Sequence, residues 1–442
     1  MARSRKRRLP TEPVKATIES LRDDGRGLAH IDGKAVHIAG ALPQEEVMFT
    51  YTRKRSKRDE GVTTEVLTPS PNRVEPPCGH FAICGGCSLQ HLTPEAQIEL
   101  KQTNLLKAFA NTNVEPDELF APLTTGATLG YRRKARLGVK NVPKKGRVLV
   151  GFREKGSSFL AEIESCAVLH PKVGQLLMSL SEMIGSLSIV DRVPQIELSM
   201  GDDDCVLVFR VLEPPSSEDR SRLDQFGVEH GIHIYLQEAG PDSVQPLQGE
   251  GVELSYQLPD FGIDVNFLPN DFTQVNYELN RLMVPRAVEL LNPQNGDLVL
   301  DLFCGVGNFT LPLATRSKSV VGVEGDQALV ERARENARRN EIDNVSFFAA
   351  NLYESLEQEP WLTQQFDKAL IDPPRSGAQE ILQHLPKMGI KRLVYVSCYP
   401  ETLARDAGEL VHNHGYRLLG AGVMDMFPHT AHVESIALFE AT

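Results

Sequence analysis

Hydrophobic residues follow three different patterns along the chain. Residues 14–68 contain short runs in which apolar and polar residues alternate, such as Val47–Tyr51, and Gly or Pro separates the runs. Residues 131–258 contain further strand-like runs, such as Cys205–Arg210. From about residue 267 onward, short apolar runs alternate with helical segments. The first pattern is typical of half-buried strands, and the last is typical of a parallel sheet covered by helices.

These patterns predict a multidomain protein with three parts. Residues 1–70 are expected to form a small β-barrel of about five strands, the shape of an OB-like nucleic-acid module, followed by a proline-rich linker at 69–77. Residues 71–262 are expected to form a mixed α/β domain, whose helix at 94–110 packs on the last domain. Residues 263–442 are expected to form a Rossmann-like α/β sheet of the doubly wound type.

The individual elements expected in the second half can also be stated. The strands are 298–302, 319–323, 345–348, 368–371 and 393–396, with a closing antiparallel pair at 416–419 and 432–439, and the helices are 171–184, one starting at 308, and 327–340.

Charge is distributed unevenly along the chain. The net charge is −12 over 442 residues, yet residues 1–60 carry 14 Lys and Arg against 9 Asp and Glu. Two basic clusters, residues 3–8 and 53–58, hold most of these cations. A basic front on an acidic body favours a localised contact with nucleic acid, although residues 3–8 alone equally fit a solubilising tail. No apolar run approaches the ~20 residues of a membrane span, so a cytoplasmic, monomeric protein without a membrane partner is expected.

Seven cysteines in such a chain argue against a disulfide framework. Cys78, Cys84 and Cys87 lie within ten residues of one another, which favours ligand chemistry. Three soft donors suit zinc or an iron–sulfur cluster, and either needs a fourth ligand. His80 lies in the same segment and would complete a zinc site of the Cys₃His type.

Residues 299–308 predict a strand, a glycine turn and the start of a helix. Gly305 and Gly307 match the first glycines of a dinucleotide motif, but Thr310 stands where the third would be. Asp301 precedes the turn, and an acidic group there suits a cationic ligand without phosphates better than NAD.

Polar residues also end the next three predicted strands. Glu324, Asn351 and Asp372 follow one another in this way, and together with Asp301 they predict one polar rim. A single Asp or Asn in a loop is more often a cap or turn residue, but the ordered set favours S-adenosylmethionine as the ligand.

Cys398 is the candidate nucleophile because it follows the apolar run 392–397, where a parallel strand gives way to a loop. A thiolate that adds to C6 of uracil makes C5 nucleophilic enough to take a methyl group. A base must then remove the C5 proton, and Glu434 is the candidate for this task. The alternatives are an inert buried thiol and a surface carboxylate paired with a cation.

Four segments together resemble the RNA uracil-C5 methyltransferase family, and the resemblance covers nearly the whole chain. They are Asp301–Asn308, Asp372–Gly377, Ser397–Asp406 and Pro428–Glu434. The front half resembles a TRAM domain followed by an iron–sulfur knot, which implies the branch that methylates uridine 1939 of 23S rRNA. The tRNA branch looks unlike this chain because it lacks both features. One departure from the family is Tyr399, where Asn is usual.

The resemblance also implies roles for individual residues. Cys398 would be the nucleophile and Glu434 the C5 proton acceptor, while Cys166 would join the three clustered cysteines as the fourth ligand of a [4Fe–4S] cluster, with zinc as the alternative metal. The implied contacts to S-adenosylmethionine are Gln274, Phe303, Asn308, Glu324, Asn351 and Asp372.

Contact with RNA is expected from Arg132 and Arg133 and from Phe272, which could replace the stacking of a base pulled out of the RNA. A core position is the alternative for Phe272. A methyltransferase that acts on amino groups of DNA or RNA is expected to have an aromatic residue where this chain has Arg375, which argues against that class. The remaining alternatives are a non-catalytic RNA-binding or assembly factor, and an enzyme that acts on tRNA or another rRNA site.

Overall fold

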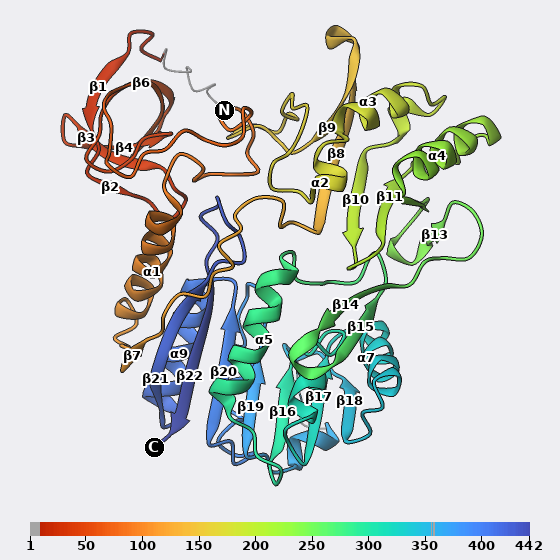
Figure 1. Cartoon of the computed structure of the whole chain (residues 1–442). Helices are drawn as coiled ribbons and strands as arrows, with labels where there is room; N and C mark the ends of the chain where they lie inside the picture. Colours follow the sequence, from red (N-terminus) through yellow and green to blue (C-terminus); the bar gives the residue numbers. More distant parts are fainter. Residues whose placement is uncertain (1–8, 355, 357–358) are drawn as a thin grey trace, which may run out of the picture. The chain divides into compact units, whose positions relative to one another are not determined.

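The computed structural model describes residues 9–354, 356 and 359–442, which divide into two compact units (Figure 1). The first unit comprises residues 1–101, 153–159 and 427–432, and the second comprises residues 102–152, 160–426 and 433–442. The basic cluster at residues 3–8 lies outside the described residues. Across the described chain, no helix is both long and apolar enough to cross a membrane.

The first unit is built on a six-stranded sheet in the order β1-β5-β6-β4-β3-β2. Its strands are β1 (Val14–Thr17), β2 (Ser20–Leu21), β3 (Gly27–Ile31), β4 (Lys34–Ala39), β5 (Glu46–Lys54) and β6 (Asp59–Thr68). Register shifts between β5 and β6 mark bulges, which bend strands, and Figure 1 shows this sheet curling around itself. The core inside includes Ile38 and Phe49, and a Cβ on Gly61 would lie 2.5 Å from the Phe49 ring. The alternating runs are therefore confirmed as strands, and their identity as a TRAM barrel stays a prediction.

The expected linker at residues 69–77 is anchored to this unit. Glu45 is fully buried, and its carboxylate accepts hydrogen bonds from the Arg73 guanidinium at 2.5 and 2.8 Å. It also accepts the backbone N–H groups of Leu42 and Ser70 at 2.8 and 3.1 Å. Burial opposes ionisation of Glu45, but these four hydrogen bonds hold its pKa below the ordinary value. Arg73 therefore fastens the proline-rich segment to the sheet.

Helix α1 (Pro94–Ala110) has the bounds expected from the sequence. It begins in the first unit, and its part from Gln102 onward belongs to the second.

A mixed six-stranded sheet, in the order β13-β12-β11-β10-β8-β9, forms one part of the second unit. Its elements are β8 (Lys134–Val142), β9 (Arg147–Gly151), α2 (Pro171–Gly174), α3 (Leu177–Gly185), β10 (Gln195–Met200), β11 (Cys205–Arg210), α4 (Ser217–His230), β12 (His233–Gln237) and β13 (Val244–Pro246). The single helix expected at 171–184 is divided into α2 and α3. Strand β8 was not predicted, because its first residues read as a basic strip.

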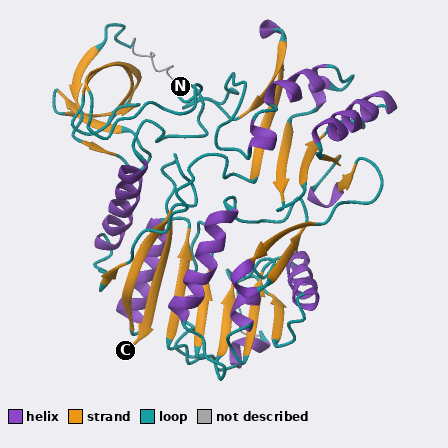
Figure 2. Ribbon diagram, in the orientation of Figure 1, coloured by secondary structure: helices purple, strands orange, loops and turns teal. Residues whose placement is uncertain are grey.

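An eight-stranded sheet, in the order β18-β17-β16-β19-β20-β22-β21-β7, forms the other part. Its elements are β7 (Glu118–Leu119), α5 (Tyr277–Leu291), β16 (Leu298–Leu302), α6 (Thr310–Ala314), β17 (Ser319–Glu324), α7 (Gln327–Arg339), β18 (Val345–Ala349), β19 (Lys368–Ile371), α8 (Gln379–Leu382), β20 (Arg392–Ser397), α9 (Pro400–Asn413), β21 (Tyr416–Met424) and β22 (Glu434–Ala441). Strands β16 to β20 are parallel, and they are apolar runs because helices cover both faces. Figure 1 shows α5 in front of this sheet and α9 behind it, and Figure 2 shows the same layers by element type. The five expected strands and the closing antiparallel pair are confirmed.

The antiparallel hairpin of β14 (Leu254–Leu258) and β15 (Ile263–Phe267) connects the two sheets along the chain. The domain boundary expected at residue 262 falls in the turn of this hairpin, between two paired strands. The three-domain division therefore stays a prediction.

Candidate active site

The parallel strands of the large sheet deliver the predicted site residues to one edge. Asp301 lies on β16, Phe303 directly follows that strand, and Glu324 ends β17. Asp372 follows β19, and Cys398 follows β20. Since these strands pair in parallel, their carboxyl ends meet at the edge where ligands bind in open α/β sheets.

The glycine turn after β16 is held by Glu324. Phe303, Gly305 and Gly307 have φ angles of 63°, 53° and 96°, and for Phe303 this left-handed conformation is strained by about 1–3 kcal/mol. The Glu324 carboxylate accepts the backbone N–H of Gly305 at 3.1 Å and that of Gly325 at 2.7 Å. The backbone N–H of Gly307 donates to the carbonyl of Cys304 at 2.9 Å, so the turn is also closed by a hydrogen bond of its own.

Two carboxyl groups at this edge favour a cationic ligand. Asp301 is fully buried; one carboxyl oxygen accepts from the Thr310 hydroxyl at 2.5 Å, and the other has no hydrogen-bond partner among the described residues. Burial, together with the charges of Asp372 and Glu324, raises the pKa of Asp301 to about 8. Burial also raises the pKa of Asp372 to about 7. A positive charge bound beside these groups would favour their ionised forms.

The Asn308 side chain makes its hydrogen bonds within the protein. Its amide oxygen accepts from the Tyr256 hydroxyl at 2.8 Å and from the Asn280 amide at 2.9 Å. Its amide nitrogen donates to the Asn280 side-chain oxygen at 3.1 Å. Asn308 therefore links the glycine turn to β14 and α5, and one amide N–H remains for the contact to the donor that the sequence predicts.

The other two predicted donor contacts lie in loops. Gln274 is half-buried in the segment between β15 and α5. Asn351 follows β18; its oxygen accepts the backbone N–H of Tyr353 at 3.1 Å, and its nitrogen donates to Glu354 at 2.8 Å. Asn351 thus shapes its own turn, and its contact with a donor stays a prediction.

The register of β20 and β22 brings the predicted nucleophile and base together. The two strands are antiparallel, and Ser397 pairs with Ser435. The next positions along this ladder are Cys398 and Glu434, which are therefore opposite one another although 36 positions separate them in the sequence. Glu434 is 3% exposed.

The surroundings of Cys398 disfavour its thiolate form. Burial, then the charges of Glu434 and Asp372, raise its pKa to about 11, while Arg375 acts in the opposite direction. Helix α9 begins two residues later, at Pro400, and the amino end of a helix also favours a thiolate.

The loop after β20 is held through the backbone of Tyr399. The Ser397 hydroxyl accepts the backbone N–H of Tyr399 and donates to its carbonyl, both at 3.2 Å. Tyr399 is 40% exposed. Ser397 therefore shapes this turn through the backbone of residue 399.

Known proteins resemble this chain over nearly its full length. The family model described as tRNA (Uracil-5-)-methyltransferase matches residues 246–442. A protein of Alkalilimnicola ehrlichii named 23S rRNA (uracil(1939)-C(5))-methyltransferase RlmD is 55% identical, over 99% of this chain and 98% of its own length. A protein of the same name from Nitrosococcus oceani is 54% identical over 100% of this chain and 99% of its own length. The chain belongs to the RNA uracil-C5 methyltransferase family.

One solved structure of the family changes an expectation. The tRNA (uracil-54, C5)-methyltransferase of Pyrococcus abyssi, in complex with S-adenosyl-L-homocysteine, is 26% identical, with a TM-score of 0.75. The match covers 96% of this chain and 99% of that one. The match extends over the front half of this chain, so the expectation that a tRNA enzyme of the family is unlike the front half in fold is wrong for this neighbour. The fold of the front half therefore does not by itself set this chain apart from that tRNA enzyme.

Family membership also raises the question of the cysteine segment, residues 78–87, which lies in the first unit. Burial lowers the pKa of Lys155 to about 8, and Cys87, Cys84 and Cys78 act against that change. One cation therefore lies close to three thiols, an arrangement that suits soft donors binding as thiolates. Among the residues that the structure describes, however, no three His, Cys, Asp or Glu side chains form a group that could hold a metal ion. The predicted cluster, for which Cys166 would come from the second unit, stays a prediction.

The three residues expected to contact RNA differ in their surroundings. Phe272 is 68% exposed and so is not a core residue. Arg133 donates to the carbonyl of Gly201 at 2.7 Å, and its guanidinium lies 5.2 Å from the centre of the Tyr277 ring. Arg132 donates through Nε to a carbonyl two residues ahead. The side chains of both arginines therefore already make contacts within the protein.

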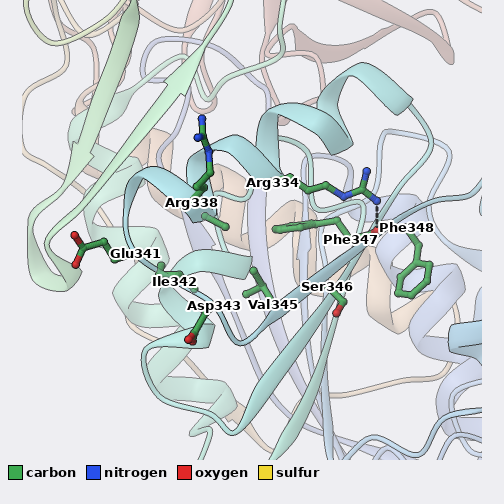
Figure 3. Close-up of a pocket in the computed structure, with 10 residues that line it drawn as sticks. Arg334, Arg338, Glu341, Ile342, Asp343, Val345, Ser346, Phe347 and Phe348 are labelled. Carbon is green, nitrogen blue, oxygen red and sulfur yellow. Dashed lines mark hydrogen bonds between the residues drawn. The ribbon is translucent and has the colours of Figure 1, made fainter.

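A surface groove lies apart from these residues. It measures about 670 Å³ over α7 and β18, and its lining includes Arg334, Arg338, Phe347 and Phe348 (Figure 3). None of the described residues along it is one of the predicted site residues. The chemistry of the strand ends therefore lies outside this groove.

The sequence did not indicate the residues that support the glycine turn after β16. Asn280 is fully buried on the apolar face of α5, and a lone asparagine on such a face is a signal that could have singled it out. Tyr256 offers no comparable signal, because its partner Asn308 is 52 positions away.

Proposed function

We propose that this protein transfers a methyl group from S-adenosylmethionine to C5 of uridine 1939 in 23S rRNA. The register that sets Cys398 opposite Glu434, beside a rim of carboxyl groups, carries the reaction class. The full-length relatives at 54–55% identity, whose names state this RNA and this uridine, support the choice of substrate.

Each step uses a residue of the described edge. The Cys398 thiolate forms a bond to C6 of uracil, and the electron pair of the C5–C6 double bond moves to C5 and the ring carbonyl. C5 then bonds to the methyl carbon, whose former bonding pair stays with the sulfur of the donor. Glu434 removes the proton from C5, the double bond forms again, and the sulfur of Cys398 leaves C6.

Ionisation of Cys398 would depend on the methyl donor. Without a ligand, burial and two neighbouring carboxyl groups hold the pKa of the thiol near 11. S-adenosylmethionine carries a positive sulfonium, which beside Asp372 would offset that negative charge and lower the pKa of Cys398. Donor binding would therefore prepare the nucleophile. Gln274 and Phe303 would complete the donor site.

Binding of RNA would involve both units. The curved sheet of residues 14–68 would act as a TRAM-like module through its basic loop at 53–58, and Phe272 would stack against a base in the second unit, flanked by Arg132 and Arg133. Cys78, Cys84, Cys87 and Cys166 would hold a [4Fe–4S] cluster. The methyl transfer involves no oxidation or reduction, so the cluster would have a structural role or would contact the RNA.

The test is methylation of defined RNAs with labelled donor, followed by mapping of the modified nucleoside. A 23S rRNA fragment should be labelled at uridine 1939, and a fragment with cytidine at that position should not. A tRNA is the necessary second substrate, because the solved neighbour from Pyrococcus abyssi acts on tRNA. Label in tRNA alone would replace the rRNA assignment, and no label in any uridine would overturn the reaction itself.

A further inference from the structure

The loop that carries Phe272 alternates between buried and exposed residues. Asp271 is 7% exposed, Phe272 is 68% exposed and Thr273 is 3% exposed. The loop follows β15 directly and leads into α5. The chain therefore holds the residues on either side of Phe272 in the protein and presents the ring to solvent.

A lysine from the other sheet holds the backbone of this loop. Lys134, the first residue of β8, donates through Nζ to the carbonyl of Pro269 at 3.0 Å and to that of Asp271. Burial lowers the pKa of Lys134 to about 8, while the charges of Asp271 and Glu197 act against that change. A largely desolvated ammonium bonded to two carbonyls fixes their separation.

An arginine from α7 holds the same loop from another side. The Asp271 carboxylate accepts the backbone N–H of Leu268 at 2.7 Å and the Arg332 guanidinium at 2.8 Å. The Arg332 and Asp271 side chains are 25% and 6% exposed. This ion pair is therefore more shielded from water than most surface pairs, and its loss costs more.

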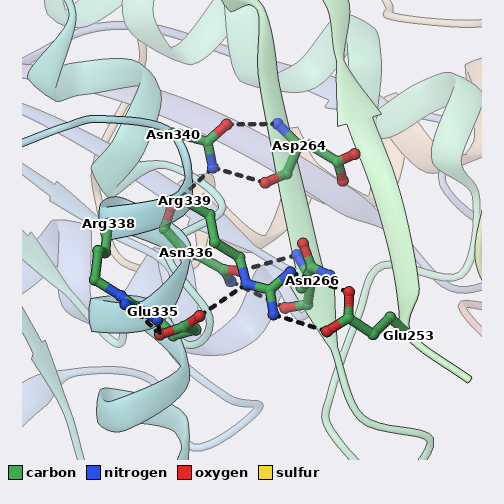
Figure 4. A network of polar contacts seen from close by, with 8 residues as sticks. All are labelled: Glu253, Asp264, Asn266, Glu335, Asn336, Arg338, Arg339 and Asn340. Carbon is green, nitrogen blue, oxygen red and sulfur yellow. Dashed lines mark hydrogen bonds and ion pairs between the residues drawn. The ribbon is translucent and has the colours of Figure 1, made fainter. Parts of the chain in front are cut away.

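Arg332 is one of three polar residues spaced four apart, two on α7 and the third, Asn340, at its C-cap. Asn340 exchanges two hydrogen bonds with the backbone of Asp264 at 2.8 Å each, and Asn336 does the same with Asn266 at 2.9 and 3.0 Å (Figure 4). These amides take the place of a neighbouring strand along β15. Asn336 also donates to the carbonyl of Val306, inside the glycine turn. One face of α7 thus connects the glycine turn after β16 to the loop of Phe272.

We propose that Lys134 and Arg332 are positioning residues that hold loop 268–273 rigid, so that Phe272 is a preformed stacking surface for a base withdrawn from the RNA. This role rests on the proposed function. An aromatic ring on a loop that is already ordered binds a base with a smaller loss of conformational entropy. Lys134 comes from β8 and Arg332 from α7, so the loop is held from two separate elements.

Hydrogen exchange on the RNA-free protein tests the restraint itself. Lys134→Met should accelerate exchange of the 268–273 amides by at least about tenfold, because two charge-assisted hydrogen bonds are lost. Arg332→Gln should do the same to a smaller extent, and Lys134→Arg should restore part of the protection. Lys140→Met, on the same strand, and Arg338→Gln, on the exposed side of α7, are the matched controls and should leave exchange unchanged.

Kinetics on the 23S rRNA fragment tests the purpose of the restraint. Phe272→Ala should raise the KM for RNA about tenfold, the size of one lost stacking contact, with donor affinity unchanged. Lys134→Met should raise this KM in the wild-type background and add nothing in the Phe272→Ala background, because it acts through that ring.

The outcomes separate the two proposals. Unchanged exchange in both Lys134→Met and Arg332→Gln would overturn the restraint, whatever the enzyme methylates. Faster exchange with additive effects on KM would overturn the link to Phe272. A wild-type protein that methylates no RNA would overturn the proposed function, while the exchange results would still decide the restraint.

Discussion

The two units organise their polar residues in different ways. In the second unit, four parallel strands deliver Asp301, Glu324, Asp372 and Cys398 to one edge, although nearly 100 positions separate the first from the last. In the first unit, three cysteines lie within ten positions, and the described conformation forms no metal-binding group from them. A regular backbone gathers residues that are distant in the sequence, whereas nearness in the sequence does not by itself gather side chains.

The same contrast holds for how each unit buries a charge. Asp301 is buried with one oxygen unpartnered among the described residues, and burial raises its pKa to about 8. Glu45 is buried with four hydrogen bonds, two of them from Arg73, so its ionisation already stabilises the fold. The strand-end site is prepared for binding, and the Glu45 site is complete without a ligand.

The largest expected effect is loss of the nucleophile at the strand ends. Cys398→Ser should reduce methylation by roughly 10⁴-fold or more, because a hydroxyl is a far weaker nucleophile than a thiolate, and donor affinity should not change. Transfer of labelled methyl groups and calorimetric titration with the donor measure the two. Cys205→Ala, on β11, is the control and should keep full reaction with the RNA. A near-normal rate in Cys398→Ser would refute covalent catalysis.

The next effect concerns the residue that the register places opposite the nucleophile. Glu434→Gln should slow turnover by about 10²–10⁴-fold, because the C5 proton loses its acceptor, and the covalent adduct of RNA with Cys398 should accumulate. A denaturing gel with labelled RNA reveals the adduct. Glu440→Gln, farther along the same strand, should behave as wild type. Normal turnover without adduct in Glu434→Gln would assign the base elsewhere.

In the first unit, the expected effect is on stability. Arg73→Met leaves Glu45 buried without its cation and should lower the free energy of unfolding by about 3–5 kcal/mol. Urea unfolding followed by proteolysis of the first unit measures this change. Arg55→Met, which breaks an exposed pair with Glu60 at 3.3 Å, should cost no more than about 1 kcal/mol. Equal effects of the two variants would contradict the importance given to the buried pair.

The cysteine segment tests whether a bound cluster brings together the thiols that the backbone alone does not. Protein purified without oxygen should contain iron and sulfide, and Cys84→Ser and Cys166→Ser should each lose both, because a cluster of this type needs four thiolates. Metal and sulfide analysis measures the content, with Cys205→Ala as the control. Stoichiometric zinc retained in Cys166→Ser would instead favour the Cys₃His alternative with His80.

The smallest expected effect is a dependence of stability on pH at the donor rim. The pKa of Asp301 is raised from 3.8 to about 8, so its contribution is fully present below about pH 4 and is lost as the pH rises through 8. The Tm of the donor-free protein should therefore fall between pH 6 and pH 9, and less so in Asp301→Asn. Asp203→Asn, an exposed control, should keep the full slope.

A cationic donor should also flatten this slope. S-adenosylmethionine carries the positive sulfonium and should stabilise the ionised rim, whereas the neutral S-adenosylhomocysteine should do so less. Equal slopes with both ligands would show that the charge of the sulfonium is not what the rim recognises.

Much of the catalytic sheet could be read from the sequence because its signals are local. Each parallel strand is an apolar run ended by a polar residue, and the run before Cys398 needed no information from elsewhere in the chain. Strand β8 escaped because its first residues continue the basic run 132–136, which read as a surface strip, whereas Arg132 and Arg133 just before the strand make contacts within the fold. Helix α5 and the β14–β15 hairpin were not predicted either, although the hairpin pairs two neighbouring segments of the chain.

The sequence by itself determined which chemical groups stand at the ends of the predicted strands, namely a thiol and an acidic rim, since periodicity and strand ends are properties of adjacent residues. Only the tertiary structure decided which of these groups meet. The register of β22 against β20 set Glu434 opposite Cys398, and contacts from Lys134 and Arg332 fixed the loop of Phe272. Residues that form hydrogen bonds across more than 60 positions leave no periodic signal in the sequence, because the two partners become neighbours only when the chain folds.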